Sequence, residues 1–392
     1  MTDKKLSILS AADLISPDEA GGSGRAAWEI SAELSRMGHA VSVVTRGVRG
    51  KSARENIGGI EVFRHFSNPA ALIRLASSVG KDIPADVMIF HQPFTSRWFL
   101  RVARRIPAIA FHYSPWHEEY EIRCDDLGRG FARRTAGSFL RKMTERAVLK
   151  SASTVFTNSN FMRARLRQNH GIESEVLHLG VDTVKFSPSA EGDTRVAAVR
   201  KSSGVPTGGI MIFTLRNLVS RMGLENLIEA FAAVAKEFPS ARLVIGGDGY
   251  LKDKLTALTA DRCPAGSVTF AGRIPDNELP DYYRASDFFV LPTRMLEGFG
   301  LVTIEALSSG VPVLATPVGS NEEILGPLGG EFIFKSAEAA SIAEGMARFI
   351  QSEDYKPPSL RNKCREYALS NFSWSACAKA VEKKLYEITG IK

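Results

Sequence analysis

The sequence predicts an α/β protein in which two Rossmann-like, doubly wound domains follow one another along the chain. Short runs rich in β-branched residues alternate with longer amphipathic stretches, which is typical of parallel strands joined by crossover helices. A polar segment rich in Pro, Gly and Ser interrupts this alternation midway, and the alternation then resumes. The length of 392 residues also fits two domains of ordinary size.

The first domain is expected at residues 1–187. Its clearest helix is Arg25–Met37, which places Ala, Ile, Leu and Met on one face and ends at Gly38. The expected strands are Leu6–Ser10, Ala40–Thr45, Ile60–Phe66, Val87–Phe90, Ala108–His112, Thr154–Thr157 and Glu175–Leu179.

A linker at 188–208 and a second α/β domain at 209–372 follow. Residues 373–392 form an amphipathic C-terminal helix, which we expect to pack back on the first domain. The second set of strands is Gly209–Leu215, Arg242–Gly246, Ser267–Phe270, Phe288–Leu291, Pro312–Thr316 and Gly330–Phe334, with helices at Leu224–Phe238 and Leu301–Ser309. Two such domains would face each other across a cleft, and ligands favour crevices at strand C-termini.

Composition narrows the class of protein. The four cysteines show no metal-ligand spacing, and no apolar run approaches the roughly 18 residues of a membrane span. The N-terminus is interpreted as a strand rather than a signal peptide. We therefore expect a cytoplasmic protein. The net charge is +7, and residues 97–167 hold fifteen Lys and Arg against six acids. This basic region lacks a reader motif, so nucleic acid is not an expected partner.

Two glycine-containing loops precede expected helices. Gly21 and Gly22 follow the first strand, where they serve either a diphosphate contact or a tight turn. Gly298 and Gly300 follow the strand Phe288–Leu291 and would bring backbone N–H groups to an anion. No glycine at position 27 completes a G-x-G-x-x-G motif, which disfavours a dinucleotide site.

Charged side chains accompany these loops in the second domain. Glu297 and Glu305 flank the glycine loop, and carboxylates accept hydrogen bonds from sugar or ribose hydroxyls. Arg216 and Arg221 follow the strand Gly209–Leu215, where each could grip a phosphate with two N–H groups and stabilise a leaving diphosphate. The alternatives are a turn residue for Glu297, a helix-dipole acid for Glu305 and two surface arginines.

Taken together, these segments resemble the retaining glycosyltransferases of family 4, which have the GT-B fold. The segment Glu297–Glu305 is similar to that family's E-x7-E pattern, and the loop with Arg216 and Arg221 resembles its phosphate-binding Arg–Lys pair. Further similar segments, in the family's order, are Gly21–Gly22, Gly38–Thr45, Leu179–Phe186, Ala306–Thr316 and Phe372–Trp374.

The resemblance implies a role for each matching residue. Arg216 and Arg221 would bind the donor diphosphate, Glu305 the ribose, and Glu297 the donor sugar and positive charge at its anomeric carbon. His112, at the end of a first-domain strand, matches the family's histidine near the transferred sugar. The implied catalytic set is His112, Glu297, Arg216 and Arg221, and the implied donor-binding set adds Gly21, Gly22, Gly247, Arg273, Ile274, Phe299, Gly300, Leu301 and Glu305.

The implied reaction moves a hexose, with retention, from a UDP- or GDP-linked sugar to a hydroxyl of a glycan or lipid-linked glycan, in polysaccharide or glycolipid biosynthesis. No D-x-D triplet occurs, which fits phosphate neutralisation by arginines, so we expect neither metal nor cofactor. The sequence departs from the family at Leu215, Asn217 and Arg221, without removing a needed charge. The alternatives are a sugar-nucleotide 2-epimerase and a non-catalytic sugar-nucleotide-binding regulator.

Residues 128–150 combine Phe, Leu and Met with six Arg and Lys beyond Arg129. One interpretation is an amphipathic helix that contacts an anionic membrane, which would place the protein at the inner membrane face. The other is a first-domain helix that packs on its own sheet. Both stay open at the level of sequence.

Overall fold

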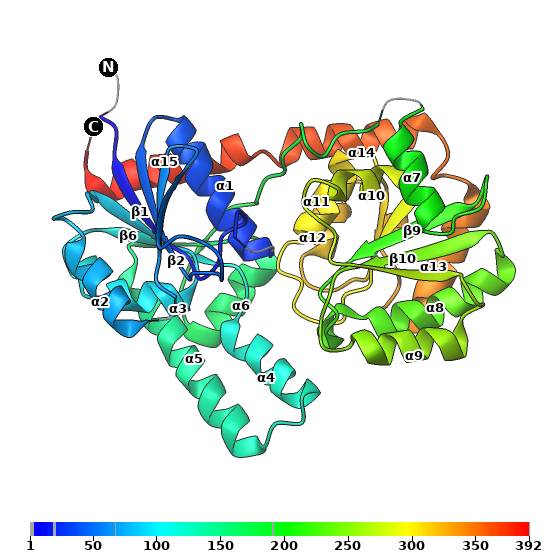
Figure 1. Cartoon of the computed structure of the whole chain (residues 1–392), viewed down its shortest axis with the longest axis horizontal. Coiled ribbons are helices and arrows are strands. Elements are labelled where there is room, and N and C mark those ends of the chain that lie inside the picture. Colours follow the sequence, from blue (N-terminus) through cyan, green and yellow to red (C-terminus); the bar gives the residue numbers. More distant parts are fainter. Residues whose placement is uncertain (1–3, 19–20, 67, 190–191, 392) are drawn as a thin grey trace. The chain divides into compact units, whose positions relative to one another are not determined.

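The computed structural model describes residues 4–18, 21–66, 68–189 and 192–391. The chain divides into two compact units, each an α/β body (Figure 1). Unit 1 comprises Met1–Gly180 and Trp374–Lys392, and unit 2 comprises Val181–Ser373. The α/β prediction is confirmed, since each unit is built on a largely or wholly parallel sheet.

The sheet of unit 1 has, within the described residues, the order β3-β4-β2-β1-β5-β6-β7-β8. Every neighbouring pair is parallel except β3 and β4, which form an antiparallel hairpin at one edge. The central strands are nearly continuous apolar runs, as strands covered on both faces should be. The strands are β1 (Ser7–Ala11), β2 (Ala40–Thr45), β3 (Arg54–Ile57), β4 (Ile60–Arg64), β5 (Val87–Phe90), β6 (Ala108–His112), β7 (Thr154–Thr157) and β8 (Glu175–Val176).

The helices of unit 1 cover this sheet and extend beyond it. The C-terminal helix α15 (Trp374–Thr389) packs on α1 (Gly22–Arg36), so both ends of the chain belong to the same unit (Figure 1). Helices α4 (Trp116–Asp126) and α5 (Phe131–Ser151) form an antiparallel hairpin whose tip projects away from the sheet (Figure 1). The remaining helices are α2 (Pro69–Ser78), α3 (Pro93–Ser96) and α6 (Asn160–His170).

The sheet of unit 2 is parallel throughout its described strands, in the order β11-β10-β9-β12-β13. Its core is aromatic, with the rings of Phe213, Tyr283 and Phe289 5.5–5.7 Å apart. Because all five strands run the same way, their C-terminal ends share one edge. The strands are β9 (Ile210–Leu215), β10 (Ala241–Gly246), β11 (Val268–Gly272), β12 (Phe288–Leu291) and β13 (Val313–Ala315).

Helices flank this second sheet on both faces (Figure 1). Helix α8 begins after Gly223, which is left-handed with φ 73°, and buries its apolar stripe on the sheet and on α13. The helices are α7 (Thr194–Ser202), α8 (Leu224–Glu237), α9 (Lys252–Arg262), α10 (Leu279–Ala285), α11 (Leu301–Ser308), α12 (Asn321–Leu325), α13 (Ala339–Ser352) and α14 (Pro358–Asn371).

In the structure the N-terminal part of unit 1 ends at Gly180 rather than at residue 187, and several expected strands are shorter. Three further segments differ from the sequence expectations. The segment 188–208, expected as a linker, contains α7, which packs on α10 of unit 2, while residues 190–191 lie outside the described ranges. The expected strand Gly330–Phe334 is instead a 3-10 turn over Gly330–Phe332, followed by one bridge from Ile333 to Ala315, and Gly330 supplies no side chain to pack. The hairpin strand β3 was not expected from the sequence, because its residues are mostly polar and do not form an apolar run.

Candidate functional site

The expected donor-binding residues follow the C-terminal ends of the parallel strands of unit 2. Arg216 comes directly after β9, Gly247 after β10 and Arg273 after β11, while Glu297 stands in the loop between β12 and α11. Since the strand ends share an edge, the fold gathers these loops on one side of the sheet.

Arg216 and Glu297 form a buried ion pair at this edge. Nη2 of Arg216 lies 2.7 Å from Oε2 of Glu297, and the two residues are only 8% and 7% exposed. The Thr293 hydroxyl donates to the same carboxylate oxygen over 2.8 Å. Burial alone would raise the pKa of Glu297, but the charge of Arg216, the Thr293 hydroxyl and the charge of Arg221 outweigh it and lower the pKa. Glu297 is therefore an ionised carboxylate at neutral pH.

Arg221 lies on the other side of the same loop system. It belongs to the short 3-10 turn Ser220–Met222, and its Nη1 donates to the carbonyl of Leu296 over 3.3 Å. Its own carbonyl accepts from the backbone N–H groups of Arg294 and Met295. The two arginines thus flank Glu297 and its preceding residue, so that two positive charges and one negative charge meet at a single strand edge.

Glycines allow these loops to approach one another closely. Gly247 has φ +114°, and a Cβ there would lie 1.9 Å from the carbonyl oxygen of Arg216. Gly223 has φ +73°, and a Cβ there would lie 1.8 Å from the carbonyl oxygen of Pro292. Any side chain at either position would push the loop of Arg216 away from its neighbours.

The loop after Glu297 ends in the start of helix α11, as the sequence predicted. Gly300 caps the helix in a left-handed conformation with φ 79°, and Leu301 is the first helical residue, so the backbone N–H groups there have no partner within the helix. The ring of Phe299 is buried and packs against Phe372. This helix start has the geometry of an anion site, although a helix of this length carries only a small dipole.

Glu305 lies one turn into α11 and is 4% exposed. Its Oε2 accepts a hydrogen bond from the Tyr283 hydroxyl over 2.9 Å. Of the other expected donor-binding residues, Arg273 is exposed, while Ile274 is half-buried and packs against Gly246. The structure therefore ties Glu297, Arg216 and Arg221 to one loop system and gives Glu305 a buried partner of its own.

In unit 1, Gly21 and Gly22 stand at the start of α1, whose first buried turn packs on Leu14. Residues 19–20 of this loop lie outside the described ranges. The preceding Asp18 is held by two hydrogen bonds from the buried guanidinium of Arg64, at 2.6 and 2.7 Å. This bidentate pair fixes the entry to the glycine turn.

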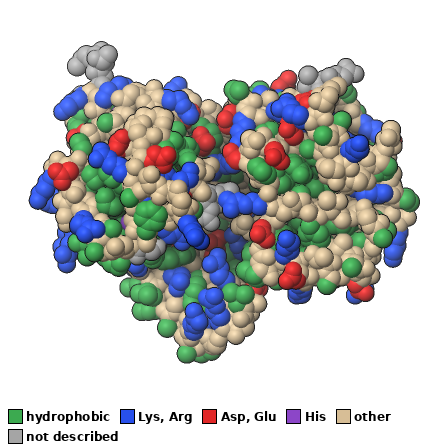
Figure 2. Space-filling model, in the orientation of Figure 1, with side chains coloured by type: hydrophobic (Ala, Val, Ile, Leu, Met, Phe, Trp, Pro, Cys, Tyr) green, Lys and Arg blue, Asp and Glu red, His purple; other side chains and the backbone are tan. Residues whose placement is uncertain are grey.

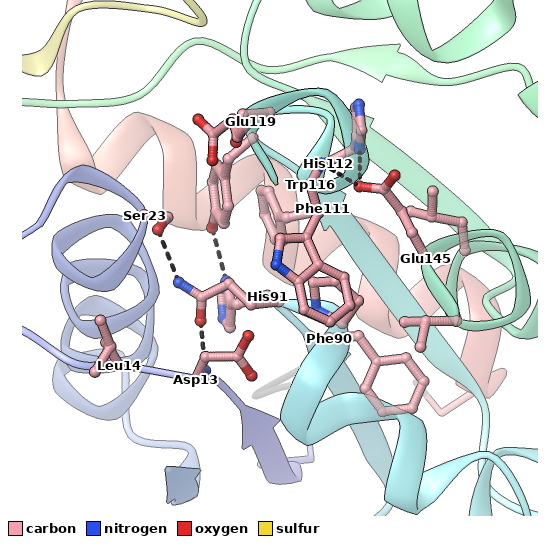
Figure 3. Close-up of a pocket in the computed structure, with 16 residues that line it drawn as sticks. Asp13, Leu14, Ser23, Phe90, His91, Phe111, His112, Trp116, Glu119 and Glu145 are labelled. Atoms are coloured by element: carbon pink, nitrogen blue, oxygen red, sulfur yellow. Dashed lines mark hydrogen bonds and ion pairs between the residues drawn. The ribbon is translucent and has the colours of Figure 1, made fainter. Parts of the chain in front are cut away.

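His112 is the last residue of β6 and lines a pocket of about 190 Å³ within unit 1 (Figure 3). Aromatic side chains and polar groups share the wall of this pocket, a mixture suited to a ligand with both apolar faces and hydroxyl groups. They include Asp13, Ser23, His91, Gln92, Tyr113, Trp116, Glu119 and Glu145. The Nε2 atom of His112 is buried and has no hydrogen-bond partner among the described residues.

Sequence analysis did not identify the partner of His112, which is Glu145 on helix α5. The carboxylate of Glu145 lies 3.5 Å from Nδ1 of His112 (Figure 3) and also contacts His117 and His170, at 3.2 and 3.0 Å. The signal available in the sequence was that Glu145 is the single acid among the basic residues of this segment. Burial would raise the pKa of Glu145, but hydrogen bonds from the three histidines hold it well below its usual value.

Two protein families together match most of the chain. Residues 20–185 match the family described as Glycosyltransferase Family 4, and residues 196–370 match the family described as Glycosyl transferases group 1. Together the two matches span most of both units.

Curated relatives include enzymes with lipid acceptors in their names. The GDP-mannose-dependent alpha-(1-6)-phosphatidylinositol monomannoside mannosyltransferase of Mycolicibacterium smegmatis is 28% identical over 58% of this chain and 61% of its own length. The alpha-monoglucosyldiacylglycerol synthase of Streptococcus pneumoniae is 25% identical over 88% of this chain and 78% of its own. The chain spans only about three fifths of the length of several curated relatives that it matches.

Among solved structures, the sucrose-phosphate synthase of Thermosynechococcus elongatus has a similar fold. It superposes with a TM-score of 0.82 at 19% identity, covering 98% of this chain and 99% of the other. At this identity the likeness shows the fold alone, which is GT-B.

Proposed function

Because the chain belongs to glycosyltransferase family 4, we propose that it transfers a hexose from a nucleotide diphosphate sugar to a hydroxyl group, with retention of anomeric configuration. The observation that carries this proposal is the arrangement of Arg216, Arg221 and Glu297 at one strand edge of unit 2. Two fixed guanidinium groups suit a diphosphate, whose negative charge grows as its bond to the sugar breaks.

In this proposal each part of the strand edge has its own task. Arg216 and Arg221 hold the diphosphate, and the backbone N–H groups of Phe299, Gly300 and Leu301 at the start of α11 add to that cradle. Glu297 stays ionised because of its arginine partners, so it can accept hydrogen bonds from sugar hydroxyls and offset positive charge at the anomeric carbon.

The remaining donor contacts are assigned by the same proposal. Glu305 binds the ribose hydroxyls, exchanging or sharing its hydrogen bond with Tyr283. Arg273 and Ile274 line the base, and Gly247 lets the backbone approach the donor. Neutralisation of the phosphates by arginines replaces a divalent cation, so the proposed reaction needs no metal. The donor is a UDP- or GDP-linked hexose, and GDP-mannose dependence in the name of one relative supports the second.

For the acceptor, we propose a glycan or lipid-linked glycan reached at a membrane surface. Within the described ranges, no helix has the length and apolar character needed to cross a membrane. The α4–α5 hairpin exposes Phe131, Phe139 and Leu140 to 78, 66 and 62%. Figure 2 shows hydrophobic and basic side chains together on the surface of this hairpin. Such a surface fits peripheral contact with anionic lipid at the inner membrane face.

A nucleotide panel tests the proposal. UDP, GDP and ADP are each added to the wild type, to Arg221→Ala, and to Arg348→Ala, which removes an exposed arginine on α13 and serves as the matched control. We expect one nucleotide at 100 times its Kd to stabilise the wild type by about 2.7 kcal/mol. The shift should persist in Arg348→Ala and be lost in Arg221→Ala.

Turnover then separates the enzyme classes. If the nucleotide is released from its hexose conjugate only when an acceptor is added, the result supports glycosyl transfer. Conversion of the donor without any acceptor would indicate a sugar-nucleotide 2-epimerase, and nucleotide binding without conversion would indicate a regulator. No binding of any nucleotide would contradict the donor site itself.

A further inference from the structure

The carboxylate of Glu145 sits at the centre of four N–H groups. Its Oε1 lies 3.1 Å from the backbone nitrogen of Trp116 and 3.5 Å from Nδ1 of His112. Its Oε2 lies 3.2 Å from Nδ1 of His117 and 3.0 Å from Nε2 of His170. Glu145 is 3% exposed, so no solvent competes for these positions.

This arrangement determines which ring nitrogen of each histidine carries hydrogen. An ionised carboxylate only accepts hydrogen bonds and offers about four lone-pair positions, which matches the four nitrogens around Glu145. Each facing nitrogen must therefore be an N–H donor. For a neutral His112 this places the proton on Nδ1 and leaves a lone pair on Nε2, the atom that is buried without a partner among the described residues.

We propose that Glu145 is a positioning residue, which holds His112 as its Nδ1–H tautomer so that Nε2 can accept a hydrogen bond from a hydroxyl group of the bound sugar. The role of His112 beside a sugar rests on the proposed function. The tautomer itself does not, because it follows from the contacts of Glu145 alone. His112 lines the pocket of unit 1, whose aromatic and hydroxyl-binding groups suit a pyranose ring (Figure 3).

The geometry of Glu145 also supplies an informative pair of variants. The backbone N–H of Trp116 can only donate a hydrogen bond, so in Glu145→Gln the amide oxygen, rather than the amide NH2, must face it at the position of Oε1. Nδ1 of His112 faces the same position and therefore keeps its acceptor. The amide NH2 then faces His117 and His170, which can shift their protons and accept. In Glu145→Leu the acceptor for His112 is gone. His170→Phe is the matched control, because among the contacts of Glu145 it removes one to Oε2 only, and it keeps an aromatic ring beside His112.

Nitrogen-15 NMR of the imidazole rings reads the tautomer directly, with the His112 signals assigned through His112→Gln. We expect His112 to be Nδ1–H in the wild type, in Glu145→Gln and in His170→Phe, and to become a mixture in Glu145→Leu. An Nε2–H tautomer in the wild type would overturn the proposal. The wild-type spectrum decides this point even if Glu145→Leu does not fold.

Kinetics separate positioning from structural support. We expect kcat per folded molecule to fall about 10- to 100-fold in Glu145→Leu, with the donor KM little changed, and to be largely restored in Glu145→Gln. Equal losses in both variants, or none in Glu145→Leu, would contradict positioning. A lower Tm and lost activity on adding a chelator to the wild type would assign His117, Glu145 and His170 to a metal ion and overturn it too. A wild type that transfers no sugar contradicts only the proposed function.

Discussion

Arg216 and Glu297 are 81 residues apart in the chain, yet Nη2 of one lies 2.7 Å from Oε2 of the other in a buried ion pair. The Nε atom of Arg216 has no hydrogen-bond partner among the described residues. In the proposed function the same arginine has two tasks. It neutralises Glu297 inside the unit, and its Nε–H group is left to bind the donor.

The first prediction concerns the stability of this pair. Arg216→Met leaves the Glu297 carboxylate buried without its main partner, which should lower the free energy of unfolding by about 3–5 kcal/mol. Arg216→Met combined with Glu297→Leu removes both charges and should recover most of that loss, because apolar pairs of similar volume replace buried ion pairs well. Urea denaturation of the two single variants and the double variant measures the coupling.

Additive losses in the double variant would contradict this coupling. They would show that each side chain is stabilised by other neighbours, such as Thr293 for the carboxylate. Nucleotide binding should be lost in every variant that lacks Arg216, whatever its stability.

The second prediction separates backbone strain from loop displacement. Gly247→Ala would bring a Cβ to 1.9 Å from the Arg216 carbonyl oxygen, so the Arg216 loop must move. Gly266 also has a positive φ, of +73°, but a Cβ there meets nothing within 4 Å, which makes Gly266→Ala the matched control. We expect both to lose about 1 kcal/mol to the backbone conformation, and Gly247→Ala to lose more.

Nucleotide affinity is the deciding measurement for these glycines. Gly247→Ala should weaken binding at least tenfold by calorimetry, while Gly266→Ala should bind as the wild type does. Equal affinities would show that the Arg216 loop accommodates the methyl group without moving its guanidinium.

Much of the fold could be predicted because many segments indicate their secondary structure by their own residue pattern. The strands Val87–Phe90, Ala108–His112 and Phe288–Leu291 are continuous apolar runs, and their predicted bounds are those of the structure. The short polar strand β3 and helix α7 could not be predicted in this way. Both are mostly polar and are stabilised by their neighbours, β4 and α10, rather than by their own pattern.

The candidate site could be predicted mainly where its residues belong to strand ends and the loops that follow them. Arg216 and His112 lie directly at strand ends and Glu297 lies in the loop after β12, and similarity to a family supplied their expected roles. Their partners were not identified, because sequence pattern does not show which distant residues come into contact. Glu145 lies on a helix face 33 residues beyond His112, where sequence pattern suggested only an amphipathic surface.

The third prediction is a pH dependence of stability. Burial lowers the pKa of His91 to about 3, and its Nε2 has no partner among the described residues. Between that value and the ordinary pKa of about 6.5, only the unfolded chain binds the proton, so stability falls as pH falls. His91 should contribute a slope of up to about 1.4 kcal/mol per pH unit in this range.

Urea denaturation between pH 6.5 and 5.5 measures this slope above the range where the carboxyl groups of the unfolded chain, including those of Glu297 and Glu145, mostly protonate. His91→Phe keeps the stacking on Phe111, whose ring centre is 5.1 Å away, and should flatten the slope. Phe111→Leu retains the histidine, so it should lower stability without changing the slope. An unchanged slope in His91→Phe would show that other groups, such as His65, dominate the titration.

The fourth prediction concerns the proposed membrane surface on the α4–α5 hairpin. Residues 131–151 carry six Arg and Lys but one acid, Glu145, which is buried and therefore offers no repulsion to anionic lipid. Replacing Phe139 and Leu140 with Ser removes two exposed apolar side chains and should weaken binding to vesicles containing phosphatidylglycerol. Ile73→Ser is the control, because Ile73 is 55% exposed on α2 of the same unit.

Vesicle flotation at two salt concentrations also separates the apolar contribution from the electrostatic one. Arg133→Glu should weaken binding at low salt and matter less at high salt, since each basic side chain near the surface contributes about 1 kcal/mol that salt screens. Phe139→Ser with Leu140→Ser should weaken binding at both. If the wild type floats equally well with neutral and with anionic vesicles, the result would contradict an electrostatic contribution to binding. Absence of flotation at low salt would contradict the proposed membrane contact.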